Sequence, residues 1–362
     1  MKVSAMKSFA PTDFRQRALG AGLRMLRASR LTRLVAPLTR GLGAILMFHH
    51  VRPWTGGAFA PNRGLEITPE FLDETIVTLR ELGFDILSID AAILRIKTGD
   101  QRERPFAVLT FDDGYRDNLV HALPVLRRHE APFTLYVTTG FADRIARLWW
   151  IELEEAIRRL DHIEARVGDA RISLAAGTDA EKSDSFKRLY WSLRAGSEAD
   201  LLKCIGDLAV DAGIDRQALV AGLCMDWDEI GVFARESLCT IGVHTLTHPM
   251  LAKHPPDVVR RELAVSRSII EAKIGAPAVH LAYPVGDPTS AGVREFALAS
   301  EFGFASAVTT RKGMIFADHA AHLTALQRLS INGGFQTRAA LETLLSGAPF
   351  YLRNFGRRLD VA

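Results

Sequence analysis

The chain has 362 residues, of which 48% are hydrophobic and 24% are charged, and its net charge is +3. This balance excludes a disordered chain and fits a soluble globular protein that buries its core without disulfide bonds. The three cysteines, Cys204, Cys224 and Cys239, show neither a paired nor a metal-binding spacing, so we expect a reducing compartment. No apolar run approaches the roughly 18 residues of a membrane-spanning helix, and none near the start is long enough for a secretory signal peptide.

The first segment, residues 1–43, is strongly basic. It contains nine Lys or Arg and a single acid, Asp13, so it carries +8 and leaves −5 for the remainder of a chain of net charge +3. Leucines and Met25 alternate with the arginines, as on an amphipathic helix that could lie on anionic lipid. The same pattern also suits a solvated helix packed on the domain, and the sequence leaves both alternatives open. We expect no nucleic-acid partner, and a location in the cytoplasm or at the inner face of a membrane.

Short apolar runs, rich in Val, Ile, Phe and Thr, recur from residue 44 onward and predict buried strands. They are residues 44–49, 84–89, 106–111, 133–138, 238–243, 279–283, 304–309 and 328–331. Helical patterns lie between several of them, for example from the N-cap Thr68 to Gly83 and from Pro256 to Gly275. Alternating strands and helices imply parallel strands. Seven or eight such units close most naturally into a barrel, whose functional site lies at the carboxyl ends of the strands.

One region interrupts this alternation. Residues 149–225 read as helical with few strand signals, which predicts a helical insertion in a barrel domain that spans residues 44–335. A helical tail, residues 336–362, is expected to follow. The insertion could shape one side of the site or only add packing.

The stretch "AVLTFDDGYRDN" places two carboxylates, Asp112 and Asp113, directly after a predicted strand. Adjacent carboxylates repel, and the repulsion is relieved if one binds a divalent metal while its neighbour stays free to accept a proton. Gly114 permits a sharp exit from the strand. Asp and Gly are also common as caps of such turns, so the motif alone does not decide.

A second stretch, "IGVHTLTHP", places His244 and His248 four residues apart after another strand. On a helical turn two such imidazoles share a face and can chelate one ion, and Pro249 requires the turn to be brief. Together with one carboxylate they would form a three-ligand site with open positions, the arrangement of a catalytic metal.

The third stretch, "AYPVGDP", follows the strand at 279–283. It is either an ordinary loop or one that leaves the backbone amide of Val285 available to an oxyanion.

In this order, "TFDDGY", "HTLTH" and "AYPVG" resemble the signature motifs of the polysaccharide deacetylases, the NodB-homology domain of carbohydrate esterase family 4, which includes chitooligosaccharide deacetylases. The resemblance extends over about residues 44–332. It implies an α/β fold, a distorted (β/α)7-8 barrel, here with a helical insertion. It also implies metal-dependent hydrolysis of N-acetyl groups, which are linear amides, on amino-sugar oligo- or polysaccharides.

Carried over by position, the resemblance makes Asp112 the general base and Val285 the donor of an oxyanion-binding amide. It makes Asp113, His244 and His248 the ligands of a divalent metal, Zn²⁺ or alternatively Co²⁺ or Mn²⁺.

Two departures from the family pattern concern its arginine and its late histidine. Ala282 stands where the family often has Arg, and no Leu-X-His follows residue 310. However, "LMFHHVRP" resembles the opening of a subgroup with circularly shifted motifs, which implies His49 as the general acid and Arg328 as the residue that orients the base. The other histidines near these motifs, His50, His319 and His322, are interpreted as incidental.

Two alternatives stay open beside the deacetylase. One is a relative that hydrolyses non-sugar cyclic amides. The other is a catalytically impaired carbohydrate-binding or polysaccharide-assembly protein, which the two departures motivate. Chitooligosaccharides, an exopolysaccharide and a lipopolysaccharide precursor are all compatible substrates.

Overall fold

A computed structural model describes residues 31–100 and 103–361, with side chains from residue 35 on. The predicted membrane contact of segment 1–43 rests on its nine basic residues. All of them except Arg33 and Arg40 precede residue 31, and these seven lie outside the described residues. None of the described helices is both long enough and apolar enough to cross a bilayer.

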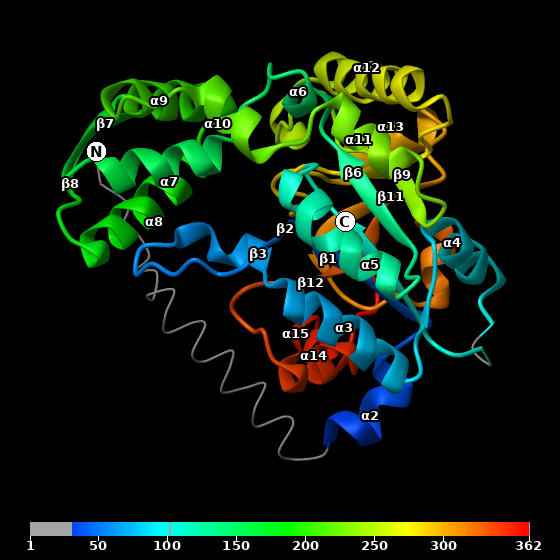
Figure 1. Ribbon diagram of the computed structural model, residues 1–362. Helices are drawn as coiled ribbons and strands as arrows, with labels where there is room; N and C mark the ends of the chain where they lie inside the picture. Colours follow the sequence, from blue (N-terminus) through cyan, green and yellow to red (C-terminus); the bar gives the residue numbers. More distant parts are fainter. Residues whose placement is uncertain (1–30, 101–102, 362) are drawn as a thin grey trace.

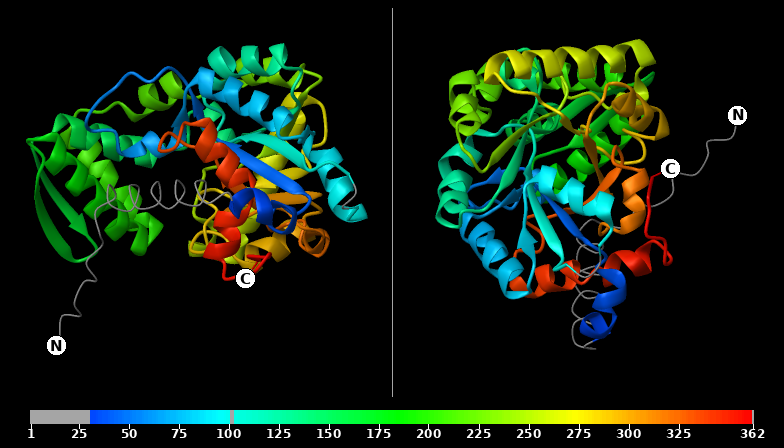
Figure 2. Two further views of the ribbon diagram at one scale, coloured as in Figure 1. Left: turned by 90° about the horizontal axis from the view of Figure 1, so that it is seen from below. Right: turned by 90° about the vertical axis from the view of Figure 1, so that its right-hand side faces the viewer.

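Parallel strands form a closed barrel surrounded by helices (Figures 1 and 2). The order around it is β1-β12-β11-β10-β9-β6-β5, and β5 pairs back to β1 over its whole length. The fold class predicted from the sequence is therefore confirmed. The strands are β1 Gly43–Phe48, β5 Phe106–Phe111, β6 Phe133–Val137, β9 Cys239–Val243, β10 His280–Ala282, β11 Ser306–Lys312 and β12 Leu326–Ser330.

All eight predicted runs become strands of this sheet, although the second shrinks to β4, Asp85–Ile86, which pairs with the start of β5. β1 and β5 are buried at every position. Strands covered on both faces read as continuous apolar runs, which is why the sequence reveals them.

The helices around the barrel begin and end where their capping residues predict. Helix α3, Pro69–Glu81, has Thr68 as N-cap, whose hydroxyl accepts the amide of Phe71 at 3.2 Å. Helix α12, Pro256–Ile274, ends at Gly275 in the left-handed region, with φ +70°. The other surrounding helices are α4 Ile89–Thr98, α5 Leu123–Arg128, α6 Thr139–Ala142, α11 Trp227–Ala234 and α13 Val293–Glu301.

Further short elements complete the chain. A small parallel pair, β2 His50–Val51 and β3 Glu66–Ile67, follows β1. Helix α2, Leu31–Thr39, precedes β1. Two helices follow β12, namely α14 Arg338–Leu345 and α15 Ala348–Arg353. The short helical turns are η1 Pro61–Leu65, η2 Asn118–Ala122, η3 Leu251–Lys253 and η4 Ala317–Ala321.

The region between residues 149 and 225 projects to one side of the barrel (Figure 1). Its helices are α7 Trp149–Arg159, α8 Asp179–Ala195, α9 Glu198–Asp211 and α10 Arg216–Leu223. It also contains an antiparallel hairpin, β7 His162–Val167 with β8 Ala170–Ala175, which the helical pattern of the sequence does not indicate. The hairpin buries few side chains, chiefly Ile163 and Leu174. Charged residues around them hide the strand pattern in the sequence.

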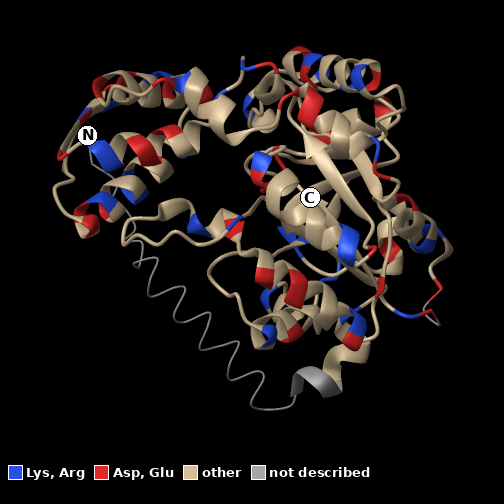
Figure 3. Ribbon diagram, in the orientation of Figure 1, with Lys and Arg blue, Asp and Glu red and all other residues tan. Residues whose placement is uncertain are grey.

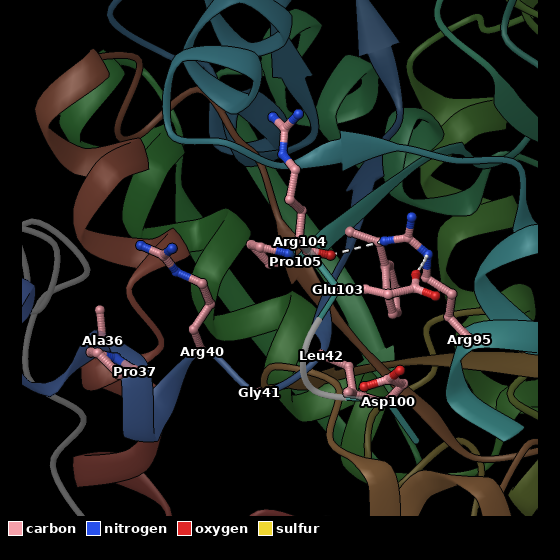
Figure 4. A pocket seen from close by; sticks show the side chains of 11 residues that line it. Ala36, Pro37, Arg40, Gly41, Leu42, Arg95, Asp100, Glu103, Arg104 and Pro105 are labelled. Atoms are coloured by element: carbon pink, nitrogen blue, oxygen red, sulfur yellow. Dashed lines mark hydrogen bonds and ion pairs between the residues drawn. The ribbon is translucent and has the colours of Figure 1, made fainter. Parts of the chain in front are cut away.

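A pocket of about 410 Å³ opens beside the first residues of β1 and β5 (Figure 4). Arg95 lies across it, donating to the carbonyl of Arg104 at 2.8 Å and pairing with Glu103 at 2.5 Å. Because these charges pair with one another, the pocket is a recess of mixed charge. It lies at the amino ends of the strands, away from the predicted site.

Candidate metal-dependent hydrolase site

The two aspartates stand where β5 ends. The amide of Asp112 still donates to the carbonyl of Phe48 on β1 at 3.0 Å, and the chain then turns sharply, with φ +72° at Asp113 and +70° at Gly114. Both aspartates are almost fully buried, at 2% and 3% exposure. Two buried carboxylates in sequence require separate partners, because an unpaired buried charge is strongly unfavourable.

The two histidines follow β9 on a loop rather than on the helical turn that their spacing predicts. Thr245 and His248 both adopt left-handed backbone, with φ +64° and +61°, which interrupts any helix. The amide of His248 donates to the hydroxyl of Thr245 at 3.1 Å. The prediction of a helical turn is therefore wrong, although both imidazoles still reach the same place.

Glu262, on α12, holds this loop from the side. Its carboxylate accepts the amides of Leu246 and Thr247, both at 2.9 Å, and the hydroxyl of Thr247 at 2.7 Å. Glu262 is 6% exposed. All three donors lie between His244 and His248, so this buried carboxylate fixes the segment that connects them. No sequence motif marks Glu262, so its role cannot be predicted from the sequence.

Asp113, His244 and His248 converge. The Nε2 atoms of both histidines lie 3.3 Å from Oδ1 of Asp113, and one ligand atom from each residue lies within 4.8 Å of the others. Among residues 31–100 and 103–361, no other group of three His, Cys, Asp or Glu meets this condition. The convergence that the sequence motifs predict is thus present in the fold.

The donor set fits a divalent cation. Nδ1 of His244 donates to the carbonyl of Ala282 at 2.7 Å, which leaves the lone pair of the neutral ring on Nε2, facing Asp113. Oδ1 of Asp113 is buried and has no well-aligned hydrogen-bond donor. A buried carboxylate that faces the Nε2 atoms of two imidazoles is a typical set of ligands for Zn²⁺ and similar ions.

The neighbouring Asp112 has a partner of its own. Arg328, on β12, donates Nη1 and Nη2 to its two carboxylate oxygens, each at 2.7 Å, and is itself fully buried. Arg328 also donates to the carbonyl of Thr309 at 2.9 Å and to the hydroxyl of Thr110 at 3.1 Å. Burial would raise the pKa of Asp112, and the guanidinium outweighs it, so the pKa lies below its usual value. Asp112 is therefore an ionised carboxylate in a fixed orientation.

Arg328, on β12, accounts for the first departure from the family pattern, which is Ala282 in the place of an arginine. Ala282, on β10, offers no side chain to Asp112, and the guanidinium reaches it from Arg328 instead. The ring of Tyr136 lies 5.9 Å from the guanidinium carbon of Arg328. Gly242, on the next strand, makes room for that ring, because an added Cβ would lie 2.5 Å from it.

His49 lies between β1 and β2 at the same end of the barrel. Its carbonyl accepts the side-chain amide of Asn118 at 2.9 Å, and the residue is half-buried. Burial lowers the pKa of His49, while the carboxylates of Asp113 and Asp112 act in the opposite direction. Its ring is thus within electrostatic reach of both aspartates.

His50, which the sequence analysis set aside, is buried beside this site. Its Nδ1 lies 2.6 Å from the carboxylate of Asp117, and its ring stacks on Tyr115 with centroids 3.5 Å apart. Asp117 also accepts the amide of Val51 at 3.1 Å, which ties the segment after His49 to the turn after the two aspartates. In contrast, His319 bonds to Phe316 and Gln327 in and near η4.

The loop after β10 carries Val285 in a left-handed conformation, with φ +60°. Its carbonyl accepts the hydroxyl of Thr310 at 2.7 Å. Gly286 follows with φ +59°, and a Cβ there would lie 2.9 Å from the carbonyl of Tyr283. The turn thus depends on glycine, and a β-branched residue with positive φ is an uncommon conformation that surrounding contacts must maintain.

The region inserted between residues 149 and 225 forms one wall of this site. Nε1 of Trp150 donates to the hydroxyl of Tyr115 at 3.2 Å, and its ring lies 4.8 Å from the ring of His248. A second link joins Arg194 of α8 to Asp287 at 2.8 Å. The insertion therefore shapes the surroundings of a predicted ligand, the first of the two roles considered from the sequence.

Three comparisons with known proteins bear on this geometry. The family model described as polysaccharide deacetylase matches residues 99–169 and 204–305. The matched segments include Asp112, Asp113, His244 and His248 but not Arg328. A search among curated proteins finds no significant match.

Several solved structures share the fold at low sequence identity. The Streptococcus pyogenes deacetylase PplD in complex with acetate is 18% identical, with a TM-score of 0.53 over 80% of this chain and 92% of that one. A Bacillus cereus polysaccharide deacetylase is 15% identical, with a TM-score of 0.51 over 84% and 68%. IcaB from Ammonifex degensii is 17% identical, with a TM-score of 0.51 over 84% and 98%. These neighbours support the barrel fold, and the family model supplies the motifs. By its motifs and its fold, the chain is thus similar to the polysaccharide deacetylases.

Proposed function

We propose that this protein is a metal-dependent hydrolase that removes N-acetyl groups from amino-sugar oligo- or polysaccharides. One observation carries the proposal. Buried Asp113, His244 and His248 converge on one point, while the adjacent Asp112 is held apart from them by Arg328. This separation provides three ligands and one independent base, which is what hydrolysis at a metal requires.

Asp113, His244 and His248 would hold the cation, with Zn²⁺ as the first candidate and Co²⁺ or Mn²⁺ as alternatives. When bound, the cation would supply Lewis-acid polarisation of the amide carbonyl. The bond from His244 Nδ1 to Ala282 keeps Nε2 of that ring directed at the cation position.

Asp112 would accept the proton of the attacking water. Arg328 keeps its carboxylate ionised and fixes its orientation by two parallel hydrogen bonds. His49 would protonate the leaving sugar amine, and the backbone amide of Val285 would donate to the oxygen that becomes negative.

The class of substrate rests on the family and on one neighbour. The Streptococcus pyogenes structure holds acetate, which is the product that removal of an N-acetyl group would release. Chitooligosaccharides, an exopolysaccharide and a lipopolysaccharide precursor are the candidate glycans. The three free cysteines favour a cytoplasmic site of action, where a substrate at the inner face of a membrane would be accessible.

The test is release of acetate from N-acetylated chitooligosaccharides and polymers by the purified full chain, with and without a chelator. We expect release that the chelator abolishes and that added metal restores. Asp112→Asn should retain the metal and lose release by a factor of about 10² or more. The matched control, Asp207→Asn on the exposed face of α9, should retain both.

Two results would overturn the proposal. Metal binding without acetate release from any of these glycans would favour the carbohydrate-binding alternative. Release that persists in Asp112→Asn would reject the assigned base.

A further inference from the structure

We infer that helices α2 and α15 form a docking surface for an anionic membrane. We call it the α2–α15 patch. It consists of four exposed apolar side chains and three exposed arginines: Leu38, Tyr351, Leu352 and Phe355, with Arg353, Arg357 and Arg358. The inference does not depend on the proposed reaction.

The apolar part of the patch is unusually exposed. Phe355 is 95% exposed, Leu38 70% and Leu352 60%. Of the twelve exposed large hydrophobic residues within the described ranges, four belong to this patch, and most of the others stand alone on their helices. Single exposed hydrophobic residues are ordinary, whereas a group of them indicates an interaction site.

The exposure of Phe355 is built into the backbone. The chain turns at Phe355 with φ +50°, which is uncommon for an aromatic residue. The amide of Phe355 donates to Leu352 at 3.2 Å, and the amide of Gly356 donates to Tyr351 at 2.8 Å. These bonds end α15 in a left-handed turn that directs a large apolar ring into water.

The two helices of the patch pack against each other (Figure 2). The hydroxyl of Thr39 at the end of α2 donates to the carbonyl of Ser346 before α15 at 2.6 Å. Thr39, Tyr351, Arg357 and Arg358 also line one small recess. Because Leu38 directly precedes Thr39, it stands at the place where the end of α2 lies beside the segment from α15 to Arg358.

The charge of the patch has one sign. Between residues 348 and 361 the only acidic side chain is Asp360, which pairs with Arg311 at 2.7 Å. Elsewhere, for example on helix α12, Lys and Arg are interspersed with Asp and Glu (Figure 3). Exposed Leu and Phe bordered by arginines match the composition of elements that lie in the interface of anionic lipids.

The charge also favours an anionic membrane over two other occupants of the patch, namely residues 1–30 and a second copy of the chain. Residues 1–30 contain seven Lys or Arg and one Asp, which gives +6, and they lead directly into α2. A segment of this charge is repelled by the three arginines, and a second copy of the patch would be repelled in the same way. An anionic bilayer attracts both the patch and the segment, so both would contribute to one binding face.

This face lies opposite the candidate site. Helix α2 ends four residues before β1 begins, so the patch is at the amino ends of the barrel strands, whereas Asp112, Asp113, His244 and His248 follow the carboxyl ends. A molecule bound through the patch would present its site to the aqueous side.

The experiment measures sedimentation of the full chain with two kinds of vesicle. One kind contains phosphatidylcholine alone, and the other also contains about 30% phosphatidylserine, a typical anionic content. We expect binding to the anionic vesicles only, weakened by salt. Leu352→Ser/Phe355→Ser should reduce the affinity at least about tenfold. Arg353→Gln/Arg357→Gln should reduce it by about fivefold for each charge removed. The control Val210→Ser/Val293→Ser removes apolar side chains of similar exposure from other helices and should bind like the natural protein.

Three results would overturn the inference. The first is no binding to either kind of vesicle. The second is unchanged binding by Leu352→Ser/Phe355→Ser, which would assign the contact to residues 1–30 alone. The third is a change in oligomeric state of that variant without a change in vesicle binding, which would make the patch a contact between copies. Circular dichroism of each variant verifies the fold, and the exposed positions make unfolding an improbable cause of lost binding.

Discussion

Replacement of Arg328 by methionine removes the charge that holds Asp112 and leaves most of the side-chain volume in place. In the natural protein the guanidinium makes four hydrogen bonds: two to Asp112, one to Thr309 and one to Thr110. Asp112 is 2% exposed, so water has little access to the carboxylate after the change. Loss of one partner of a buried ion pair destabilises a protein by about 3–5 kcal/mol, and we expect Arg328→Met to lower the free energy of unfolding by that amount at pH 7.

The pH dependence of this loss follows from the direction of the pKa shift. Arg328 lowers the pKa of Asp112, so the pair stabilises the fold above the ordinary carboxyl pKa of about 4 and ceases to do so as the pH falls through the lowered value. Without the arginine, burial acts against the charged form and raises the pKa of Asp112. The difference in stability between the natural protein and Arg328→Met should therefore be largest at neutral pH and shrink as the pH falls, first through the raised pKa of Asp112 in the variant and then through its lowered pKa in the natural protein.

Urea unfolding followed by tryptophan fluorescence, at pH 7 and at pH 4, provides the assay. Two variants control for the volume change. Arg328→Lys keeps the positive charge but loses the planar guanidinium. Its free energy of unfolding should lie between those of the natural protein and Arg328→Met. Arg328→Met/Asp112→Leu removes both partners and should lose less stability than Arg328→Met alone. The reasoning is refuted if Arg328→Met loses under about 1 kcal/mol, or if the double variant loses as much as the sum of the single changes.

Three further predictions test other parts of the site. Glu262→Gln replaces an acceptor of three hydrogen bonds on the loop between the histidine ligands, and should weaken metal affinity about 10- to 100-fold in a chelator competition; equal affinity in a folded variant would contradict the role of Glu262. Asp287→Asn should lower stability by about 1 kcal/mol at pH 7 and by progressively less as the pH falls through the pKa of Asp287, which its bonds, including that from Arg194, hold below the usual value against the effect of burial; a loss that does not change with pH would argue against this. Gly242→Ala places a Cβ 2.5 Å from the ring of Tyr136 and should lower the free energy of urea unfolding by about 1–3 kcal/mol, whereas a loss under about 0.5 kcal/mol would show that the ring moves freely.

The barrel could be predicted because its signals are local. A strand such as β5, buried at every position, must be an uninterrupted apolar run, and helices such as α3 carry their own caps in Thr68 and Pro69. The hairpin β7–β8 was missed because only one side of it is covered, and its exposed residues interrupt the pattern. Local signals thus predict elements whose burial is complete and fail where burial depends on a distant neighbour.

The candidate site likewise contains residues that local sequence signals predict and residues that they do not. Asp112, Asp113, His244 and His248 lie in short motifs directly after strands, so strand prediction and spacing sufficed to group them. Nothing in the sequence near these motifs marks the side chains that hold them from other elements. Arg328 could be suggested by resemblance alone, and Glu262, His50 and Trp150 could not be suggested at all, because their partners are distant in the sequence.

Backbone conformation at the site is another feature that local sequence signals do not predict. Among the described residues, four non-glycine positions at the site, Asp113, Thr245, His248 and Val285, adopt positive φ. Each such residue costs about 1–3 kcal/mol, and the β-branched Thr245 and Val285 have no local reason to accept it. Long-range contacts maintain both, since the carbonyl of Thr245 accepts the amide of Thr139 at 3.2 Å and that of Val285 accepts the hydroxyl of Thr310 at 2.7 Å.

This strain explains why a helical turn was the wrong prediction for the two histidines. Spacing of four residues is satisfied equally by a helix and by a loop whose ends are pinned, and only the surrounding contacts select the loop. The same contacts direct both imidazoles at Asp113. The packing of the barrel therefore balances the backbone strain that fixes these three side chains relative to one another.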